Sequence, residues 1–330
     1  FNLGSRKQIG EYLIEFGWKP TQHTPTGQPI VDEKTLSKIE NIPEAKTIAE
    51  YLMIQKRLAQ VNSWLEQADQ NDNRVRGYVN TIGAVTGRMT HSSPNMAQVP
   101  SCNSPYGSEC RSCWTVDTGN KLIGIDASGL ELRMLAHYMD DEAYTYELLN
   151  GDIHTSNQNL AGLKSRNQAK TFIYALLYGA GDAKLGSVVG GNTRDGTQLR
   201  ERFFDNLPAF KTLKDRVARA SKKGYLKGLD GRKLFVRSEH SALNTLLQGA
   251  GAIVMKEALV VLNDWLFAEG ITNCFVANVH DEWQIEIKAE LADRVGILGV
   301  KAIEQAGRNL NLKCELTGEY NVGNNWAETH

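Results

Sequence analysis

The sequence predicts an α+β fold, and three segments support this prediction. Residues 46–67 repeat apolar side chains at helical spacing without an internal proline or glycine. Residues 122–126 form a short apolar run that ends in a carboxylate and precedes a second helical pattern. Residues 275–279 and the alternating residues 283–287 flank a polar trio, as in a β-hairpin with charges at its tip. Long helices are therefore expected beside a sheet whose strands end in charged residues.

The composition is that of an ordinary globular protein. The chain has 330 residues, of which 41% are hydrophobic, enough for a large core and for two or three domains or subdomains. It contains no run of about 18 apolar residues and no signal-peptide pattern, so a cytoplasmic protein without membrane contact is expected. The first residue is Phe1 rather than methionine, which suggests a processed or excerpted part of a longer polypeptide.

The five cysteines are expected to be reduced thiols. Cys110 and Cys113 have the spacing of metal ligands, and Cys102 lies nearby in the sequence. No second such pair and no close histidine completes a zinc site in this stretch. Ordinary thiols are therefore favoured over zinc ligands.

The net charge of −1 hides a marked segregation of charge. Residues 164–237 hold 17 Lys+Arg and 6 Asp+Glu, an excess of +11, whereas the remainder of the chain sums to −12. A basic segment beside an acidic remainder suits a protein that binds phosphates on one side and metal ions on the other. A lysine-rich, solvated helix surface would explain the same charge equally well.

A basic and aromatic stripe is predicted on one helix. Residues 165–179 are expected to be helical, with Ser165 as N-cap, Gln168 completing a capping box, and glycines at the end. Side chains four residues apart lie along one face of a helix, and the residues so spaced here are Arg166, Lys170, Tyr174 and Tyr178. The cations stand at the N-terminal end, where the helix dipole also favours an anion such as a triphosphate.

Two aspartates are candidates for metal binding. Asp126 and Asp281 each stand at the end of a predicted strand, where the side chain is exposed and the sheet holds the backbone. If the fold joins them, paired carboxylates could hold two divalent cations about 4 Å apart, and Mg²⁺ suits carboxylates combined with substrate phosphates. A lone aspartate at a strand end is more often a turn cap, so the prediction rests on the conjunction with the helical stripe.

Three motifs of the chain, in the expected order, resemble motifs A, B and C of the DNA polymerase I family (family A). They are Asp126-Ala-Ser-Gly-Leu-Glu131-Leu-Arg133, Arg166-(x3)-Lys170-(x3)-Tyr174-(x3)-Tyr178-Gly179, and Val279-His280-Asp281-Glu282. The segments Thr86-Gly-Arg88, Asp230-Gly-Arg232 and Asn244-(x3)-Gln248-Gly249 also resemble this family. The similarity runs from Phe1 to Trp326 and is greatest to replicative polymerases of T-odd podophages.

The resemblance implies a role for each candidate residue. The catalytic residues would be Asp126, Asp281, Lys170 and Arg166. Two Mg²⁺ ions, replaceable by Mn²⁺, would be held by Asp126, Ala127, Asp281 and Glu282. No organic cofactor would be needed. The incoming dNTP would be bound by His154, Arg166, Lys170, Tyr174 and Glu131, the last of these excluding a ribose 2′-hydroxyl. Primer–template DNA would be contacted by Arg88, Tyr178, Asn244, Gln248 and His280. Without the resemblance, Asn244 and Gln248 would suit helix capping or a buried amide network.

The resemblance also implies a right-hand polymerase fold. The end of the thumb and a connecting helix would comprise residues 1–60. The palm, with its antiparallel sheet, would comprise residues 61–149 and 238–330, and the helical fingers would comprise residues 150–237. The proofreading exonuclease that usually precedes this module is expected to be missing, together with most of the thumb. A separate or upstream polypeptide would supply both, and a processivity factor is a further conceivable partner.

Three other functions compete with a DNA polymerase. A single-subunit RNA polymerase shares the helical stripe and the two aspartates, but Glu131 argues against it. A catalytically silent template-binding subunit is compatible with a missing exonuclease and thumb, but it would not need every metal and triphosphate residue. A two-metal nuclease could use the same aspartates but has no need of the stripe from Arg166 to Tyr178.

Overall fold

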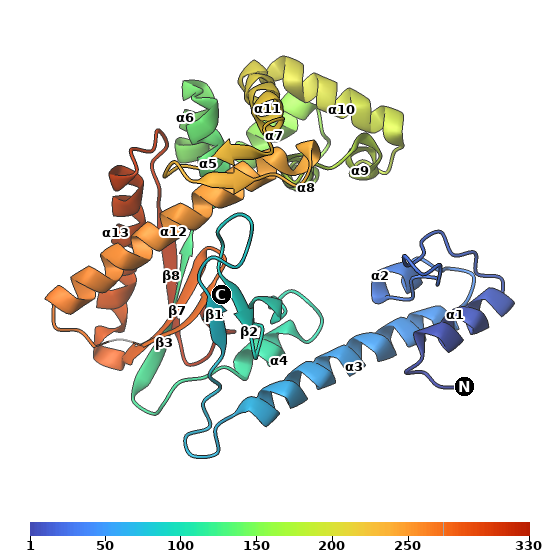
Figure 1. Cartoon of the computed structure of the whole chain (residues 1–330), viewed down its shortest axis with the longest axis horizontal. Helices are drawn as coiled ribbons and strands as arrows, with labels where there is room; N and C mark the ends of the chain where they lie inside the picture. The colour runs from blue at the N-terminus through green and yellow to red at the C-terminus, as the bar shows by residue number, and fades with distance from the viewer. Residues whose placement is uncertain (273) are drawn as a thin grey trace. The chain divides into compact units, whose positions relative to one another are not determined.

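A computed structural model describes residues 1–272 and 274–330. The chain forms two compact units, Phe1–Gly77 and Tyr78–His330, which are described separately here (Figure 1). The α+β class is confirmed, because helices accompany an antiparallel sheet. The assignment of segments to thumb, palm and fingers stays a prediction.

An antiparallel sheet lies at the centre of the second unit. Its order is β6 (Cys274–Val279), β7 (Glu282–Lys288), β3 (Asn120–Ala127) and β8 (Gly318–Gly323). The predicted hairpin is confirmed as β6 and β7, and the predicted strand before Asp126 is confirmed as β3. Neighbouring strands thus come from distant parts of the sequence, and the sheet joins the two candidate aspartates.

Two long helices support this sheet. α13 (Ala292–Asn309) packs on β3 and β8, and α12 (Ala242–Ala268) packs on α13 and runs on toward the helices between β3 and β6 (Figure 1). Close approach requires a glycine at one contact, since a Cβ on Gly299 would lie 2.3 Å from Cδ1 of Ile125. The side chain of Ile125, just before Asp126 in β3, therefore packs directly against the backbone of α13.

The segment Glu239–Ala268 is long and apolar enough to cross a membrane by length and composition. Its most apolar window is 67% buried inside the structure. This burial is typical of the core helix of a globular domain, so most of the apolar residues of α12 have protein partners.

The helices between β3 and α12 form a cluster around a shared core. They are α5 (Leu130–Met139), α6 (Glu142–Asn150), α7 (Ile153–Ala161), α8 (Arg166–Leu177), α9 (Asp182–Ser187), α10 (Thr193–Asn206) and α11 (Pro208–Ser221). Phe203 stands edge-on to both Phe172 and Phe210, with ring centroids 5.5 Å apart in each pair. These fully buried rings fix α8 against α10 and α11.

The predicted start of α8 is confirmed, with one difference in its cap. The hydroxyl of Ser165 accepts a hydrogen bond from the backbone N–H of Gln168 at 3.2 Å. The side chain of Gln168, however, accepts from the N–H of Lys164 rather than from that of Ser165. The side chain of Gln168 therefore satisfies a donor one residue earlier than the donor that a capping box would satisfy.

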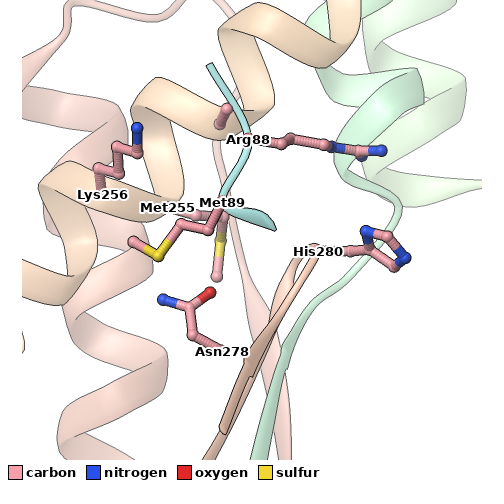
Figure 2. Close-up of a pocket in the computed structure, with 7 residues that line it drawn as sticks. Arg88, Met89, Met255, Lys256, Asn278 and His280 are labelled. Atoms are coloured by element: carbon pink, nitrogen blue, oxygen red, sulfur yellow. The ribbon is translucent and has the colours of Figure 1, made fainter. Parts of the chain in front are cut away.

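Short elements complete the second unit. They are β1 (Tyr78–Asn80) with β2 (Thr90–Ser92), β4 (Tyr225–Lys227) with β5 (Lys233–Phe235), and α4 (Gly107–Ser112). The loop between β1 and β2 carries Arg88, whose side chain lines a small pocket with residues of α12 (Figure 2). Within the described residues, no group of three or more His, Cys, Asp or Glu side chains could hold a metal, so the zinc alternative for Cys110 and Cys113 gains no support.

The first unit is a small helical assembly. It contains α1 (Arg6–Glu15), α2 (Glu33–Leu36) and α3 (Glu44–Gln67), and α3 confirms the helix predicted for residues 46–67. Ser5 caps α1 and Asp32 caps α2 through their side-chain oxygens. The largest fully buried side chains of this unit are Ile9, Leu13 and Leu36.

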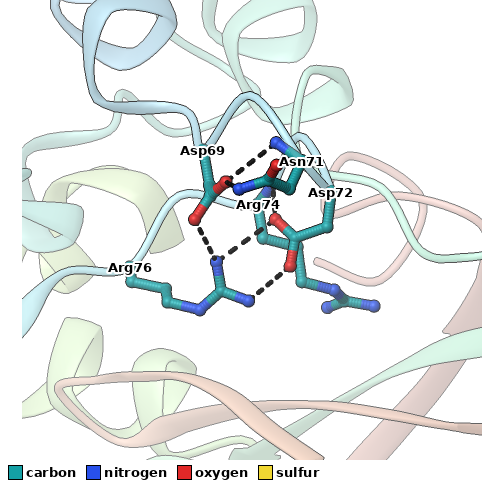
Figure 3. Close-up of polar contacts among 5 residues, drawn as sticks. All are labelled: Asp69, Asn71, Asp72, Arg74 and Arg76. Atoms are coloured by element: carbon teal, nitrogen blue, oxygen red, sulfur yellow. Dashed lines mark hydrogen bonds and ion pairs between the residues drawn. The ribbon is translucent and has the colours of Figure 1, made fainter.

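A polar turn follows α3 at the end of the first unit (Figure 3). Both carboxylate oxygens of Asp72 accept from Arg76, and Oδ2 of Asp69 lies 3.6 Å from the same guanidinium. The hydrogen bond from Arg76 is the main reason that the pKa of Asp72 is lowered to about 2. These groups are exposed to solvent, so they shape the turn and contribute little to stability.

Candidate active site

The register of β3 and β7 brings the two candidate aspartates together. Asp126 is paired with Glu282, and the N–H of Ala127 donates to the carbonyl of Asp281 at 3.1 Å. Asp281 stands in the two-residue turn between β6 and β7, next to His280, whose φ of 59° is left-handed. Both carboxylates therefore lie at the same end of the sheet, on backbone that pairing on both sides of β3 holds in place.

Burial and nearby negative charge raise the pKa of both aspartates. Loss of hydration and the charges of Asp281 and Glu282 raise the pKa of Asp126 to about 7. The Asp126 side chain is open to solvent at its tip, but the surrounding protein displaces much of its hydration shell. Burial and the charge of Glu131 likewise raise the pKa of Asp281. Such a site is poised to accept a positive charge.

Glu282 lies behind this pair and is turned into the protein. Its side chain is 5% exposed, and Oε1 accepts hydrogen bonds from the indole N–H of Trp326 at 2.6 Å and from the amide of Gln284. Its Oε2 lies 2.8 Å from Nδ1 of His330. The hydrogen bonds from these partners lower the pKa of Glu282 against the effect of burial. In this arrangement Glu282 contributes a fixed negative charge, with both oxygens already in use.

Glu131 links the aspartates to two predicted DNA-contacting residues. It lies in the first turn of α5 and accepts a hydrogen bond from the hydroxyl of Tyr178 at 3.2 Å. Nη2 of Arg88 lies 3.5 Å from the same carboxylate oxygen. Arg88 and Glu131 are each less than one-fifth exposed, so this pair is shielded from water. The structure thus brings Arg88, Glu131 and Tyr178 into one polar network.

The aromatic part of the α8 stripe forms a stack beside Glu131. The rings of Tyr174 and Tyr178 have centroids 6.4 Å apart and are inclined by 27°. The imidazole of His154, on α7, lies 6.4 Å from the ring of Tyr174. Burial, followed by the charges of Glu131 and Asp281, raises the pKa of Tyr174, which places this phenol in the same electrostatic field as the acids. The stripe therefore faces the carboxylate cluster.

The basic part of the stripe is organised by Asp152, a residue that the sequence reasoning did not select. Asp152 is the N-cap of α7, and its Oδ1 accepts from the N–H of His154 at 3.1 Å. Its Oδ2 accepts from Nε of Arg166 at 2.7 Å. Loss of hydration, followed by the charges of Arg166 and Lys170, lowers the pKa of His154. His154, Arg166 and Lys170 therefore lie in one electropositive neighbourhood at the start of α8.

The remaining predicted DNA-contacting residues lie on α12 and on the β6–β7 turn. Asn244 and Gln248 are one turn apart on α12 and half-buried. In the described part of the chain, neither side chain makes a hydrogen bond or caps the helix, so helix capping and a buried amide network do not account for them. His280 lines the pocket that contains Arg88 (Figure 2), and burial lowers its pKa.

The donor set at the sheet suits a hard divalent cation. Asp126 and Asp281 supply carboxylates, Ala127 supplies a backbone carbonyl, and the raised pKa of each aspartate reports unneutralised negative charge. No group of three or more acidic, histidine or cysteine side chains that could hold a metal occurs among the described residues. Two carboxylates that leave other positions to water and substrate phosphates are typical of Mg²⁺ sites.

Residues 1–328 match the profile of DNA polymerase family A. The chain is 41% identical over its whole length to the DNA-directed DNA polymerases of Enterobacteria phage T3 and Escherichia phage T7, and it covers 53% of each. It is 28% identical to DNA polymerase I of Pseudomonas aeruginosa, covering 39% of that protein.

Among solved structures, the chain is similar to the polymerase domain of Pol1 from M. smegmatis in complex with DNA primer–template and dNTP. The TM-score is 0.90 at 22% identity, with 99% of this chain and 62% of that chain covered. This likeness confirms the predicted right-hand polymerase fold. The chain spans about half the length of the phage relatives, and it belongs to DNA polymerase family A.

Proposed function

We propose that the chain is the polymerising module of a template-directed DNA polymerase that adds dNTPs to a primer 3′-hydroxyl and releases pyrophosphate. One observation carries this proposal. The register of β3 and β7 places Asp126 and Asp281 together, opposite a helix that presents cations at its start and phenols further along. The phage relatives, whose names state this activity, support a role in phage DNA replication.

The aspartates would hold the metal ions of the reaction. Asp126, Asp281 and the backbone carbonyl of Ala127 would bind two Mg²⁺, or Mn²⁺ in its place, and Glu282 would add charge from behind. When bound, such ions lower the pKa of an attacking hydroxyl and neutralise the leaving oxygen. No organic cofactor is needed for this chemistry.

The start of α8 would bind the triphosphate. Arg166, Lys170 and His154 would contact its oxygens, with the N-terminal dipole of α8 adding to their charge. Asp152 holds Arg166 through Nε, which leaves the two terminal nitrogens of the guanidinium free for a bidentate contact. The chain thereby orients the α-phosphorus for in-line attack by the primer hydroxyl, and positioning supplies much of the rate enhancement.

The network around Glu131 would select the sugar and the base pair. Glu131 would exclude a ribose 2′-hydroxyl, and Tyr174 would pack beneath the sugar while Tyr178 borders the templating position. The residues proposed to contact the minor groove and the primer end are Arg88, Asn244, Gln248 and His280. Contacts to minor-groove acceptors common to all correct pairs check geometry without reading sequence.

The module would act with further protein parts. Residues 61–149 and 238–330 would form the palm, residues 150–237 the fingers, and residues 1–60 the end of the thumb. A separate or upstream polypeptide would supply the exonuclease and the rest of the thumb, and a processivity factor would be a further partner. The setting would be the cytoplasm of an infected host.

Primer extension with Mg²⁺ tests this proposal. A labelled primer on a longer template is offered deoxynucleotides or ribonucleotides, with wild-type chain and with Glu131→Ala. Extension with deoxynucleotides only, and added ribonucleotide use by Glu131→Ala, is the expected result.

Each alternative has its own outcome in the same assay. Ribonucleotide extension by the wild type would indicate an RNA polymerase, and shortening of the primer would indicate a nuclease. Tight duplex binding without either reaction would indicate a template-binding subunit.

A further inference from the structure

Lys256 ties together the two ends of the loop between β1 and β2. Its ammonium group, on α12, donates to the carbonyl of Thr81 at 2.6 Å and to the carbonyl of Gly87 at 2.6 Å. Thr81 directly follows β1, and Gly87 lies near the return of the loop to β2. One side chain therefore closes the loop and ties it to α12.

The loop that Lys256 closes carries Arg88. Gly87 has a φ of 77°, so the chain turns sharply immediately before Arg88. Arg88 and Lys256 line the same pocket, and Figure 2 shows their side chains extending to opposite sides of the loop. Arg88 reaches Glu131 at 3.5 Å, whereas Lys256 stays on the backbone of the loop.

The chemistry of the contact requires a lysine-like donor. Two carbonyl oxygens converge on one point, and an ammonium group can donate to both at once. Removal of that group would leave two acceptors facing a small pocket lined in part by Met89, Met255 and Ala252. Desolvation, with added repulsion from Arg232, lowers the pKa of Lys256, so the two hydrogen bonds offset a cost of burying the charge.

Lys256 lies on the same helix as two of the proposed DNA-contacting residues. Asn244, Gln248 and Lys256 follow one another on α12, with Gln248 about one turn beyond Asn244 and Lys256 about two turns beyond Gln248. The same helix thus presents two side chains toward the minor groove and holds the loop that presents the third, Arg88.

We propose that Lys256 is a positioning residue for Arg88: it fixes the loop of residues 81–89 so that the Arg88 guanidinium is presented to the primer-terminal base pair. This inference rests on the proposed polymerase function. Lys256 acts through the loop and does not touch the reacting atoms.

The test compares Lys256→Met with Arg88→Ala and with the double variant. Methionine keeps the length of the stem among Met89 and Met255, so the fold is expected to persist and is checked by thermal melting. Lys301→Met is the matched control, since Lys301 is an exposed lysine on α13. Amide hydrogen exchange of residues 81–89 and single-turnover extension from matched and mismatched primer ends are measured.

Lys256→Met is expected to speed amide exchange in the loop by roughly tenfold. It should slow extension from a matched primer end nearly as much as Arg88→Ala, with little change in KM for the dNTP. The double variant should be no slower than Arg88→Ala within about twofold, because both changes act on one contact.

Two results would overturn the inference. One is amide exchange in residues 81–89 that Lys256→Met leaves unchanged. The other is an extension rate that falls in the double variant by the product of the two single-variant factors. An active wild type that is insensitive to Lys256→Met would reject only the role of Lys256, whereas a wild type that extends no primer would reject the proposed function itself.

Discussion

The two ends of the candidate site are held in different ways. At the sheet, Asp126 and Asp281 are placed by strand pairing on both sides of β3, and the neighbouring Glu282 is 5% exposed. At α8, Arg166 is placed by a single ion pair with Asp152, in which the side chains are 53% and 42% exposed. Backbone pairing gives one geometry, whereas an exposed ion pair is weak and exchangeable. The metal end is therefore built to be rigid, whereas the triphosphate end can adjust to its ligand while Asp152 keeps its contact with Nε of Arg166.

The largest effect on primer extension is expected from a change at the aspartates of the sheet. Asp126→Asn keeps the shape of the side chain but removes the charge that would bind a cation, so extension should fall by roughly 10³-fold. Single-turnover primer extension measures the loss.

Asp264→Asn, an exposed aspartate on α12, serves as the control and should extend primers at the wild-type rate. A loss of less than about tenfold for Asp126→Asn would show that the sheet end does not carry the chemistry.

The hydrogen bond from Trp326 to the buried Glu282 should contribute to the free energy of unfolding. Trp326→Phe removes the indole donor to Glu282 and leaves a buried carboxylate oxygen with one partner fewer. The free energy of unfolding is expected to fall by about 2 kcal/mol, measured by urea denaturation.

Trp283→Phe is the matched control, because Trp283 is also fully buried but its indole N–H has no hydrogen-bond partner among the described residues. Equal costs for the two tryptophan variants would mean that packing, rather than the hydrogen bond to Glu282, sets the stability of this region.

At the start of α8, loss of Asp152 should change binding of the dNTP more than it changes the free energy of unfolding. Asp152→Ala removes both the cap of α7 and the partner of Arg166, and KM for the dNTP should rise about tenfold. Asp152→Asn keeps one acceptor oxygen, which can still cap α7, but it replaces the acceptor of Arg166 with an N–H donor, so KM for the dNTP should rise nearly as much as in Asp152→Ala.

The free energy of unfolding should change by less than about 1 kcal/mol for Asp152→Asn. If Asp152→Asn keeps the wild-type KM for the dNTP, the contact with Asp152 does not place Arg166 for the triphosphate.

The smallest effect concerns divalent cations and pH. The pKa of Asp126 is raised from 3.8 to about 7, so its contribution to the stability of the metal-free chain is complete below pH 4 and is lost as the pH rises through 7. Mg²⁺ should therefore raise Tm by about 3 °C at pH 8 and by less at pH 6.

KCl at the same ionic strength controls for screening, and Asp126→Asn should abolish the difference between the two pH values. A shift in Tm that is equal at pH 6 and pH 8 would place the cation away from Asp126.

Local patterns predicted the elements well, since α3, α8, β3 and the β6–β7 hairpin all follow from periodicity and caps. The pairing of β3 with β7 could not be derived from spacing, because nothing local specifies which distant strands meet. The predicted residue types at the site were found together, as the Glu131 network shows.

Supporting residues were harder to find from sequence. Asp152 carried a weak signal, since an aspartate just before a helix is a common N-cap. Lys256 and His330 carried none, because their partners, two backbone carbonyls and the side chain of Glu282, are far away in the sequence.

The strand order β7–β3–β8 has a consequence for how the chain folds. β3 is complete at Ala127, but both of its partners come from residues beyond 281. During synthesis, an apolar strand with two unpaired edges must wait while the helices from α5 to α11 form from local contacts. Such edges promote aggregation, so slow translation of the last third of the chain should lower the yield of folded protein before it lowers the activity of each folded molecule.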